Sequence, residues 1–283
     1  MKKYKITSMM DTNQHRKDFI MPSTYTHYAL ANEIIPLLPE ELRNVCTTYK
    51  KQFLMGAQGP DFFYFYRPIR HNTYTKLGKQ IHDTNFDELL KYMLPVLREY
   101  SSNSKEYAYV LGFITHFTLD SIFHPYVIPQ VKKIKFRHTA METEFDRSLL
   151  ISHGEEPHKY PLWNAIPTDE DTIDCVSHLF YDTPKKVIRE CILTYHFFRK
   201  LFYTPNKFRY YIVKAIFKPL KRREFFGNLL FSYQERPKAA RTNPELHIRY
   251  QYALKEAVKN INIFHEDFKK GHPMDEIFHR NFK

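Results

Sequence analysis

The sequence predicts an all-α fold, with about ten helices in a single domain. Only seven of the 283 residues are glycine, whereas sheet-rich folds need glycine in their tight turns. Apolar residues recur at the three- and four-residue spacing of helices, and no alternating pattern is long enough to predict a strand. Hydrophobic residues make up 43% of the chain, which is enough for a sizeable core. The scarcity of glycine also argues against the glycine-rich loops that bind nucleotides.

The chain divides by composition into three parts. Residues 1–21 are polar and lack periodicity, so we predict a disordered leader, with Met21 as an alternative start. Residues 22–160 hold the clearest helical patterns and are the predicted helical core. Residues 161–283 are predicted to be a further helical part of the same domain.

Capping residues, glycines and prolines predict where the first helices begin and end. The stretch "STYTHYALANEIIPLL" offers a Ser or Thr cap and an apolar face that runs to Pro36. A second helix over 40–55 is predicted to end at "MGAQGPD", whose two glycines and proline favour a loop. The aromatic stretch 56–75 is then predicted to be a loop.

Prolines and glycines separate the later helices. A helix over 105–123 is predicted to end at Pro125 and Pro129, because proline removes a backbone donor. A helix over 135–152 is predicted to end at Gly154. The other predicted helices span 76–99, 168–181, 185–203, 207–232 and 244–270.

The overall charge and the cysteines narrow the classes of function. The formal net charge is +12, which suggests contact with nucleic acid or an anionic membrane surface. Three widely spaced cysteines form no CxxC motif, so neither a thiolate zinc site nor a disulfide framework is indicated. The first twenty residues lack the apolar core of a secretory signal, and no apolar run approaches the ~18 residues of a membrane span. We therefore expect a cytoplasmic protein.

Histidine and acidic residues recur four positions apart, a spacing that places both side chains on one face of a helix. Fifteen histidines and 31 acidic residues should give on the order of 1–2 such pairs by chance. Four are present, and the pairs His178/Asp182 and His272/Glu276 are expected to be solvated helix pairs. The other two lie among apolar residues and are His116/Asp120 and His138/Glu142.

The two pairs in apolar surroundings are candidates for a metal site. His124 extends the His116/Asp120 row by one turn if the helix lasts, and Asp146 lies one turn beyond Glu142. Imidazole nitrogens and carboxylate oxygens are ordinary zinc ligands. The alternative is that Asp120 only forms a hydrogen bond with a histidine in the core, because a buried carboxylate needs a partner.

Single residues elsewhere have two interpretations each. Asp61 follows Gly-Pro in a tight turn and would serve either as a ligand or as the cap of a short helix. His27, His71 and His82 stand alone, and a lone histidine is more often structural than a ligand. The aromatic residues 62–66 that follow Asp61 would line a lipid cleft or pack in the core.

Four ordered segments resemble the zinc-dependent phospholipase C family, in its bacterial, leaderless form. They are "PSTYTHYALANEI", "GAQGPDFFYF", "GFITHFTLDSIFHPY" and "RHTAMETEFDRSLL", and together they cover residues 22–152. The combination of Gly-x-x-Gly-Pro-Asp, His-x3-Asp-x3-His-Pro and His-x3-Glu makes the resemblance specific. It implies an all-helical protein that holds two zinc ions, or three, in a cleft.

The resemblance implies a ligand set position by position. The first zinc would be held by Asp61, His116 and Asp120 with a further histidine, for which "LGKQIHDTNF" favours His82 over His71. The second would be held by His124, His138 and Glu142. Asp120 would bridge towards a third metal held by His27. Secreted members also use an N-terminal tryptophan amine for that metal, and position 14 here is Gln14.

The resemblance also implies the reaction, which is the hydrolysis of a phospholipid by a metal-activated water. Asp61 would ligate zinc or deprotonate this water. A zinc-dependent nuclease acting on single-stranded nucleic acid is the second hypothesis, and a membrane-associated protein with a structural metal site is the third. The basic stretch 207–223, "KFRYYIVKAIFKPLKRR", agrees with peripheral contact with an anionic membrane, such as the inner membrane face. Its alternative is an ordinary surface helix.

Overall fold

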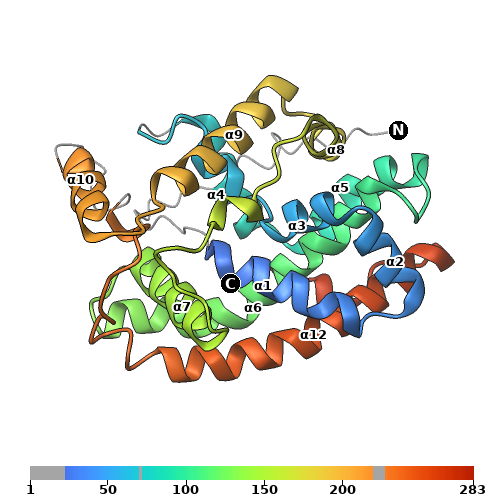
Figure 1. Cartoon of the computed structure of the whole chain (residues 1–283). Coiled ribbons are helices and arrows are strands. Elements are labelled where there is room, and N and C mark those ends of the chain that lie inside the picture. Colours follow the sequence, from blue (N-terminus) through green and yellow to red (C-terminus); the bar gives the residue numbers. More distant parts are fainter. Residues whose placement is uncertain (1–22, 70–71, 219–226) are drawn as a thin grey trace.

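A computed structural model describes residues 23–69, 72–218 and 227–283, and within these ranges it is all-α (Figure 1). The predicted leader, 1–21, and the alternative ligand His71 lie outside the described residues. The eleven α-helices of the described part are α1 (Thr24–Ile34), α2 (Glu40–Thr48), α3 (Lys50–Ala57), α4 (Thr73–Asp83), α5 (Phe86–Glu99), α6 (Lys105–Lys133), α7 (His138–Ser152), α8 (Glu170–Leu179), α9 (Lys185–Leu201), α10 (Lys207–Phe217) and α12 (Asn243–Lys270). The predicted all-α fold class is confirmed.

Four 3₁₀ helices complete the described elements. They are η2 (Ile35–Leu37), η3 (Asp61–Phe65), η4 (Leu162–Ala165) and η5 (Glu276–Phe278). The stretch expected to be a loop therefore contains η3. Two predicted helices are each divided in two, because the backbone at Tyr49 leaves the helical region and Asn85 begins a new helix. None of the described helices is long and apolar enough to cross a membrane.

The predicted end of the central helix at Pro125 is wrong, because α6 continues through both Pro125 and Pro129 to Lys133. The two prolines lie one turn apart on the exposed face of the helix, where water can solvate the carbonyl groups that they leave without a donor. The helix therefore lasts past His124, as the metal-site prediction requires.

Two glycines bring α3 and α6 into direct backbone contact. A Cβ atom on Gly56 would lie 2.0 Å from the carbonyl oxygen of Tyr109, and one on Gly112 would lie 2.0 Å from that of Phe53. Only glycine fits at this crossing. The close approach places the loop that follows α3 beside the middle of α6.

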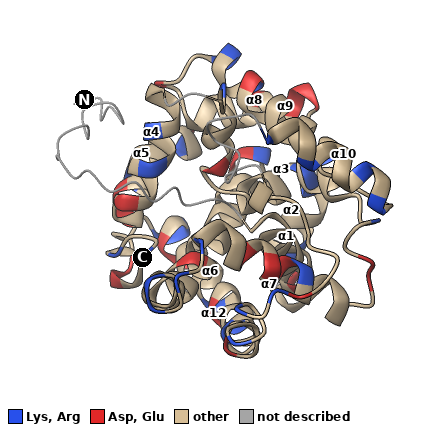
Figure 2. Ribbon diagram, turned by 90° about the vertical axis from the view of Figure 1, so that its left-hand side faces the viewer, with Lys and Arg blue, Asp and Glu red and all other residues tan. Residues whose placement is uncertain are grey.

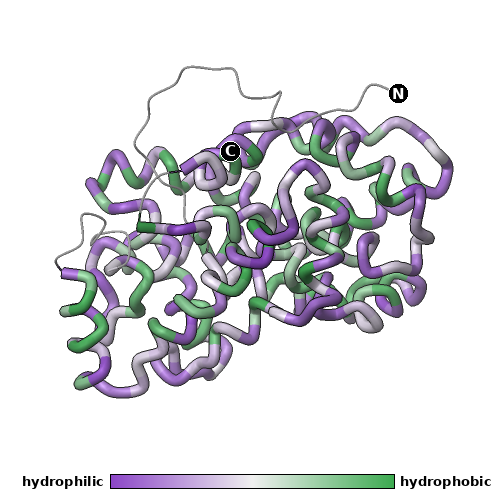
Figure 3. The backbone as a smooth tube through the Cα atoms, turned by 90° about the horizontal axis from the view of Figure 1, so that it is seen from above, coloured by the Kyte–Doolittle hydropathy of each residue, from purple (hydrophilic) through white to green (hydrophobic). Residues whose placement is uncertain are grey.

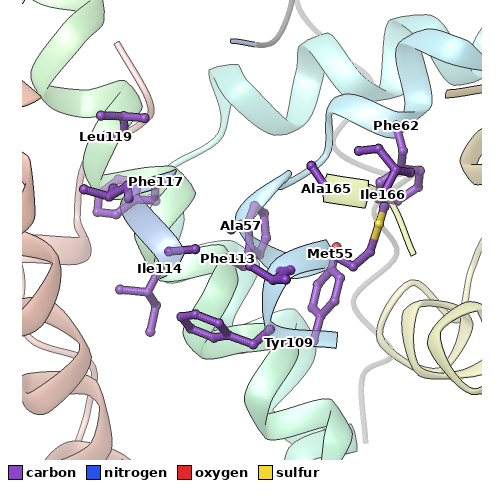
Figure 4. Close-up of a cluster of buried hydrophobic side chains, with 14 of the residues drawn as sticks. Met55, Ala57, Phe62, Tyr109, Phe113, Ile114, Phe117, Leu119, Ala165 and Ile166 are labelled. Carbon is purple, nitrogen blue, oxygen red and sulfur yellow. The ribbon is translucent and has the colours of Figure 1, made fainter. Parts of the chain in front are cut away.

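One hydrophobic cluster runs through the described helices. Figure 4 shows the part around the α3–α6 crossing, where Met55, Phe62 and Tyr109 pack together with Phe113. Hydrophobic and hydrophilic residues alternate along the helices around it (Figure 3). Phe62, Phe63, Tyr64 and Phe65 are at most 1% exposed, so these aromatic residues pack in the core, and the expectation that they line a lipid cleft is not supported.

Candidate metal centre

The eight predicted ligands come from five elements and converge in one region. His27 lies on α1, Asp61 begins η3, His82 lies in the last turn of α4, and α6 and α7 supply the rest. All eight are buried, with exposed fractions of 0–8%. Their ligand atoms form three groups, in each of which all atoms lie within 4.8 Å of one another: His27/His116/Asp120, Asp61/His82/His116 and His124/His138/Glu142.

The group of Asp61, His82 and His116, called the first group below, joins α4, η3 and α6; the group of His124, His138 and Glu142 is called the second and that of His27, His116 and Asp120 the third. Nε2 of His82 lies 3.2 Å from Oδ1 of Asp61. Both atoms, and Nε2 of His116, are buried without a hydrogen-bond partner. The Nδ1 atoms of His82 and His116 instead face the carbonyl oxygens of Gly78, at 2.7 Å, and Ala57, at 3.2 Å. A donated Nδ1–H leaves the lone pair on Nε2, the arrangement found around ligating histidines.

Asp120 divides its two oxygens between neighbouring groups. Oδ1 lies 3.3 Å from Nε2 of His27, and Oδ2 lies 3.3 Å from Nε2 of His116 and 3.6 Å from Nε2 of His82. The rings of His27 and His116 stack with centroids 4.2 Å apart. A carboxylate placed in this way has the geometry to bridge two metal ions. The alternative of a single histidine–aspartate hydrogen bond does not describe it, because three imidazoles surround this carboxylate.

The second group joins α6 and α7. Oε1 of Glu142 lies 2.7 Å from Nε2 of His138 and 3.6 Å from Nε2 of His124, whereas Oε2 is buried without a partner. Nδ1 of His124 lies 2.5 Å from the carbonyl oxygen of Phe282. That carbonyl fixes the His124 ring, so that Nε2 faces Glu142.

Burial and neighbouring charges act against each other in this region. Burial works to lower the pKa of His124, but the nearby Asp120 and Glu142 carboxylates outweigh it and raise this pKa to about 9. The pKa of His116 is lowered, chiefly by burial. The pKa of Asp120 lies well below its usual value, because His116 and His124 outweigh the effect of burial. These are the opposing influences that a cluster of histidines and carboxylates creates in an apolar interior.

The buried lone pairs test whether the residues fit zinc. Asp61, His82, His116 and Glu142 each have a buried nitrogen or oxygen without a hydrogen-bond partner. Leaving even one such atom unpaired costs about 1–3 kcal/mol. Histidine nitrogens and carboxylate oxygens that converge in groups of three are a usual zinc donor set. The residues present therefore fit the metal.

The comparison with known proteins agrees with this geometry. A model of the zinc-dependent phospholipase C family matches residues 26–197, more than half of the chain. The chain belongs to this family. The matched range contains all eight predicted ligands, and it leaves out α10 and α12. No curated protein and no solved structure matches the chain.

Membership in the zinc-dependent phospholipase C family supports the general function of a zinc-dependent hydrolase. The assignment of individual ligands stays a prediction that the geometry supports. His82 lies beside Asp61, whereas His71, the other histidine considered, lies outside the described residues. The pairs expected to be solvated along helices differ from the prediction. His178 faces Glu106 at 2.9 Å, and α12 ends before His272.

Sequence reasoning missed the residues that hold the ligands in place. The three backbone carbonyl groups that face Nδ1 of a predicted ligand histidine belong to Ala57, Gly78 and Phe282. Every residue has a carbonyl group, so the sequence does not show which of them make such contacts. The Phe282 ring lies 5.1 Å from the His82 ring and 5.8 Å from the His116 ring. From the sequence, Gly59 is predicted only to be a loop residue. Its φ of +54° and a Cβ position 2.3 Å from the His116 ring both require glycine.

Proposed function

We propose that this family member is a phospholipase C-type phosphodiesterase that uses two zinc ions. In this reaction the oxygen of a water molecule forms a bond to phosphorus and the bond between phosphorus and the glycerol oxygen breaks. The proton from water passes to the leaving oxygen, and the products are diacylglycerol and a phosphorylated head group. The observation that carries the proposal is the convergence of histidines and carboxylates in two groups that contain buried atoms without hydrogen-bond partners, three in the group of Asp61, His82 and His116 and one, Oε2 of Glu142, in the other.

The proposed ligand groups would hold one zinc ion each. The first ion would be held by Asp61, His82, His116 and Asp120, and the second by His124, His138 and Glu142. When bound, zinc supplies positive charge to the phosphoryl oxygens and lowers the pKa of bound water. The chain keeps the ligands oriented through backbone carbonyls and keeps the region dry through burial.

A third metal has fewer ligands in the described residues. Because Nδ1 of His116 faces a carbonyl, this residue has one lone pair to offer, and the first zinc uses it. His27 and Asp120 then remain for the third ion. We therefore propose two zinc ions as the working set, with a third site at His27 that needs ligands beyond the described residues.

Asp61 has two alternative roles in the proposal, either as a ligand or as the base that takes a proton from the attacking water. Its position favours ligation, because its unpartnered Oδ1 lies 3.2 Å from Nε2 of His82.

The least buried of the eight side chains are His138, Glu142 and Asp120, so substrate would approach from the side of α7. The predicted peripheral location at the inner face of a membrane belongs to this proposal too.

A substrate panel tests the proposal. The zinc-loaded protein is assayed on phosphatidylcholine, phosphatidylglycerol and single-stranded DNA, and the products are identified by mass spectrometry. We expect diacylglycerol from at least one lipid and no cleavage of DNA. Cleavage of DNA alone would favour the zinc-dependent nuclease hypothesis, and turnover of none of the three would favour the structural metal site.

A further inference from the structure

One face of α10 is apolar and exposed. Its large side chains Phe208, Tyr211, Ile212 and Ile216 are 78%, 63%, 45% and 52% exposed. The opposite side of the helix is buried through Val213 and Phe217. The exposed residues recur at intervals of three and four, so they form one continuous stripe along the helix. A stripe of this kind on a soluble domain marks a surface that binds something apolar.

Positive charges flank this stripe. Lys207, Arg209, Lys214 and Lys218 lie on or directly after α10, and residues 201–218 contain no acidic residue. Figure 2 shows blue segments and no red ones along α10. An apolar face with cationic borders is the composition of helices that lie in the surface of an anionic bilayer. The helix lies outside the residues that match the family, so the family does not account for it.

A basic pocket opens on another side of the same helix. It has a volume of about 320 Å³ and is lined by Tyr210 and Lys214 of α10 together with Arg137, Gly227, Asn228 and Arg236. None of its lining residues within the described part of the chain is a carboxylate. The guanidinium of Arg236 forms an ion pair with Glu144, with Nε 3.1 Å from Oε1. A pocket with three cationic side chains suits a phosphate group.

The pocket is close to the metal centre along the chain. Arg137 is the residue directly before His138, where α7 begins. His138 and Glu142 are among the least buried of the predicted ligands. The start of α7 therefore supplies one residue to the basic pocket and the next residue to the metal centre.

We propose that α10 docks on an anionic phospholipid bilayer and that the adjoining basic pocket takes the phosphate-bearing head group of a lipid in that bilayer. Docking by α10 does not depend on hydrolysis, whereas the delivery of substrate from that bilayer to the metal centre rests on the proposed function. A bilayer fits better than single-stranded nucleic acid, because the exposed face between the cations is aliphatic as well as aromatic.

Vesicle sedimentation of the full chain tests the docking surface. Wild type is compared on vesicles of phosphatidylcholine alone and of phosphatidylcholine mixed with phosphatidylglycerol, and we expect tighter binding to the mixture. The double variant Phe208→Ser/Ile212→Ser should bind at least about tenfold more weakly, because two buried apolar contacts with the acyl region are lost. The matched control is Ile248→Ser on α12, a residue that is 66% exposed and should bind as wild type does.

A second pair of variants tests the pocket. Lys214→Gln should weaken binding to the mixed vesicles about fivefold, the loss expected for one cation near an anionic surface. The exposed Lys255 of α12 provides the control, and Lys255→Gln should leave binding unchanged. Circular dichroism and thermal unfolding verify that every variant is folded.

Several outcomes would overturn the inference. They are equal binding of wild type to both kinds of vesicle, wild-type binding by the Phe208→Ser/Ile212→Ser variant, and equal effects of the two lysine variants. Displacement from the vesicles by a single-stranded oligonucleotide that depends on Lys214 would assign the surface to nucleic acid. Hydrolysis of short-chain phosphatidylcholine and phosphatidylglycerol, each dissolved as monomers, reports on the proposed function separately. Docking without that hydrolysis contradicts the function, and hydrolysis without docking contradicts the inference.

Discussion

Two buried carboxylates lie one turn apart on α7 and have opposite surroundings. The carboxylate of Asp146 accepts four hydrogen bonds, from the hydroxyls of Ser23 and Thr26 and from the backbone amides of Tyr25 and Thr26, at 2.5–3.0 Å. The carboxylate of Glu142 faces two histidines through one oxygen, and its other oxygen is buried without a partner.

The difference separates a structural carboxylate from a candidate ligand. Asp146 caps the start of α1 from another helix, so it replaces the side-chain cap expected from Ser23, which makes none. Burial raises the pKa of Asp146. For Glu142 burial acts in the same direction, but His138 and His124 outweigh it and lower the pKa. A buried carboxylate whose oxygens accept all the hydrogen bonds they can hold stabilises the fold. A buried carboxylate that is surrounded by histidines and keeps one oxygen without a hydrogen-bond partner is typical of a metal site.

The largest effect on zinc is expected from Asp120→Ala. This change removes both oxygens that face the first and third groups, so bound zinc should fall and hydrolysis should decrease by more than the ~10–100-fold that loss of a second-shell partner costs. Zinc content and lipid hydrolysis are measured together. Asp171→Ala, at a side chain that is 82% exposed, is the control. Retained zinc and activity would show that the bridge is misassigned.

Asp61→Ala should have the next largest effect on zinc. It also distinguishes between the two roles of Asp61, zinc ligand and general base. We expect the zinc content to fall by about one ion per chain, because the unpartnered oxygen beside His82 is lost. The content is measured by mass spectrometry of the metal after gel filtration. Full zinc content with a rate reduced about 10²–10⁴-fold would instead identify Asp61 as the general base.

Phe282→Ala should lower zinc affinity indirectly, because Phe282 positions His124 through its carbonyl and packs against His82 and His116 through its ring. Without the ring, the segment that supplies the carbonyl to His124 loses its packing against His82 and His116, so zinc affinity should fall about tenfold. Competition with a chelator measures the affinity. Phe282→Leu, which keeps apolar volume, should restore most of it.

Phe278→Ala is the matched control for lost packing. Phe278 is also fully buried and its ring meets those of Phe86 and Phe117. It should lower stability by about 3–5 kcal/mol without a specific loss of zinc affinity. Equal losses of zinc affinity in Phe278→Ala and Phe282→Ala would contradict a positioning role for Phe282.

Asp146→Asn should have the smallest effect on zinc. It should lower the free energy of unfolding by about 2 kcal/mol, because the amide cannot accept from all four donors. Denaturant titration measures this loss, and the zinc bound by the second group should remain. Loss of that zinc would place Asp146 in the metal centre and remove the contrast with Glu142.

The sequence predicted which histidines and carboxylates lie close together better than it predicted the elements that hold them. His116, Asp120 and His124 share a face because a helix repeats every 3.6 residues, and their four-residue spacing in the sequence predicts this. Pro125 was misleading, since the cost of a proline depends on whether solvent or a partner reaches the freed carbonyl. Phe282 lies 158 residues from His124, and its contribution is a backbone oxygen. Contacts of that kind depend on the tertiary fold, so local pattern does not reveal them.

The zinc content of the purified full chain tests the central claim most directly. Metal analysis after removal of loosely bound ions should find two zinc ions per chain, or three when the His27 site is filled, and the Asp120→Ala variant should bind fewer. A wild-type chain that remains folded but binds no zinc, even when zinc is supplied, would contradict the account.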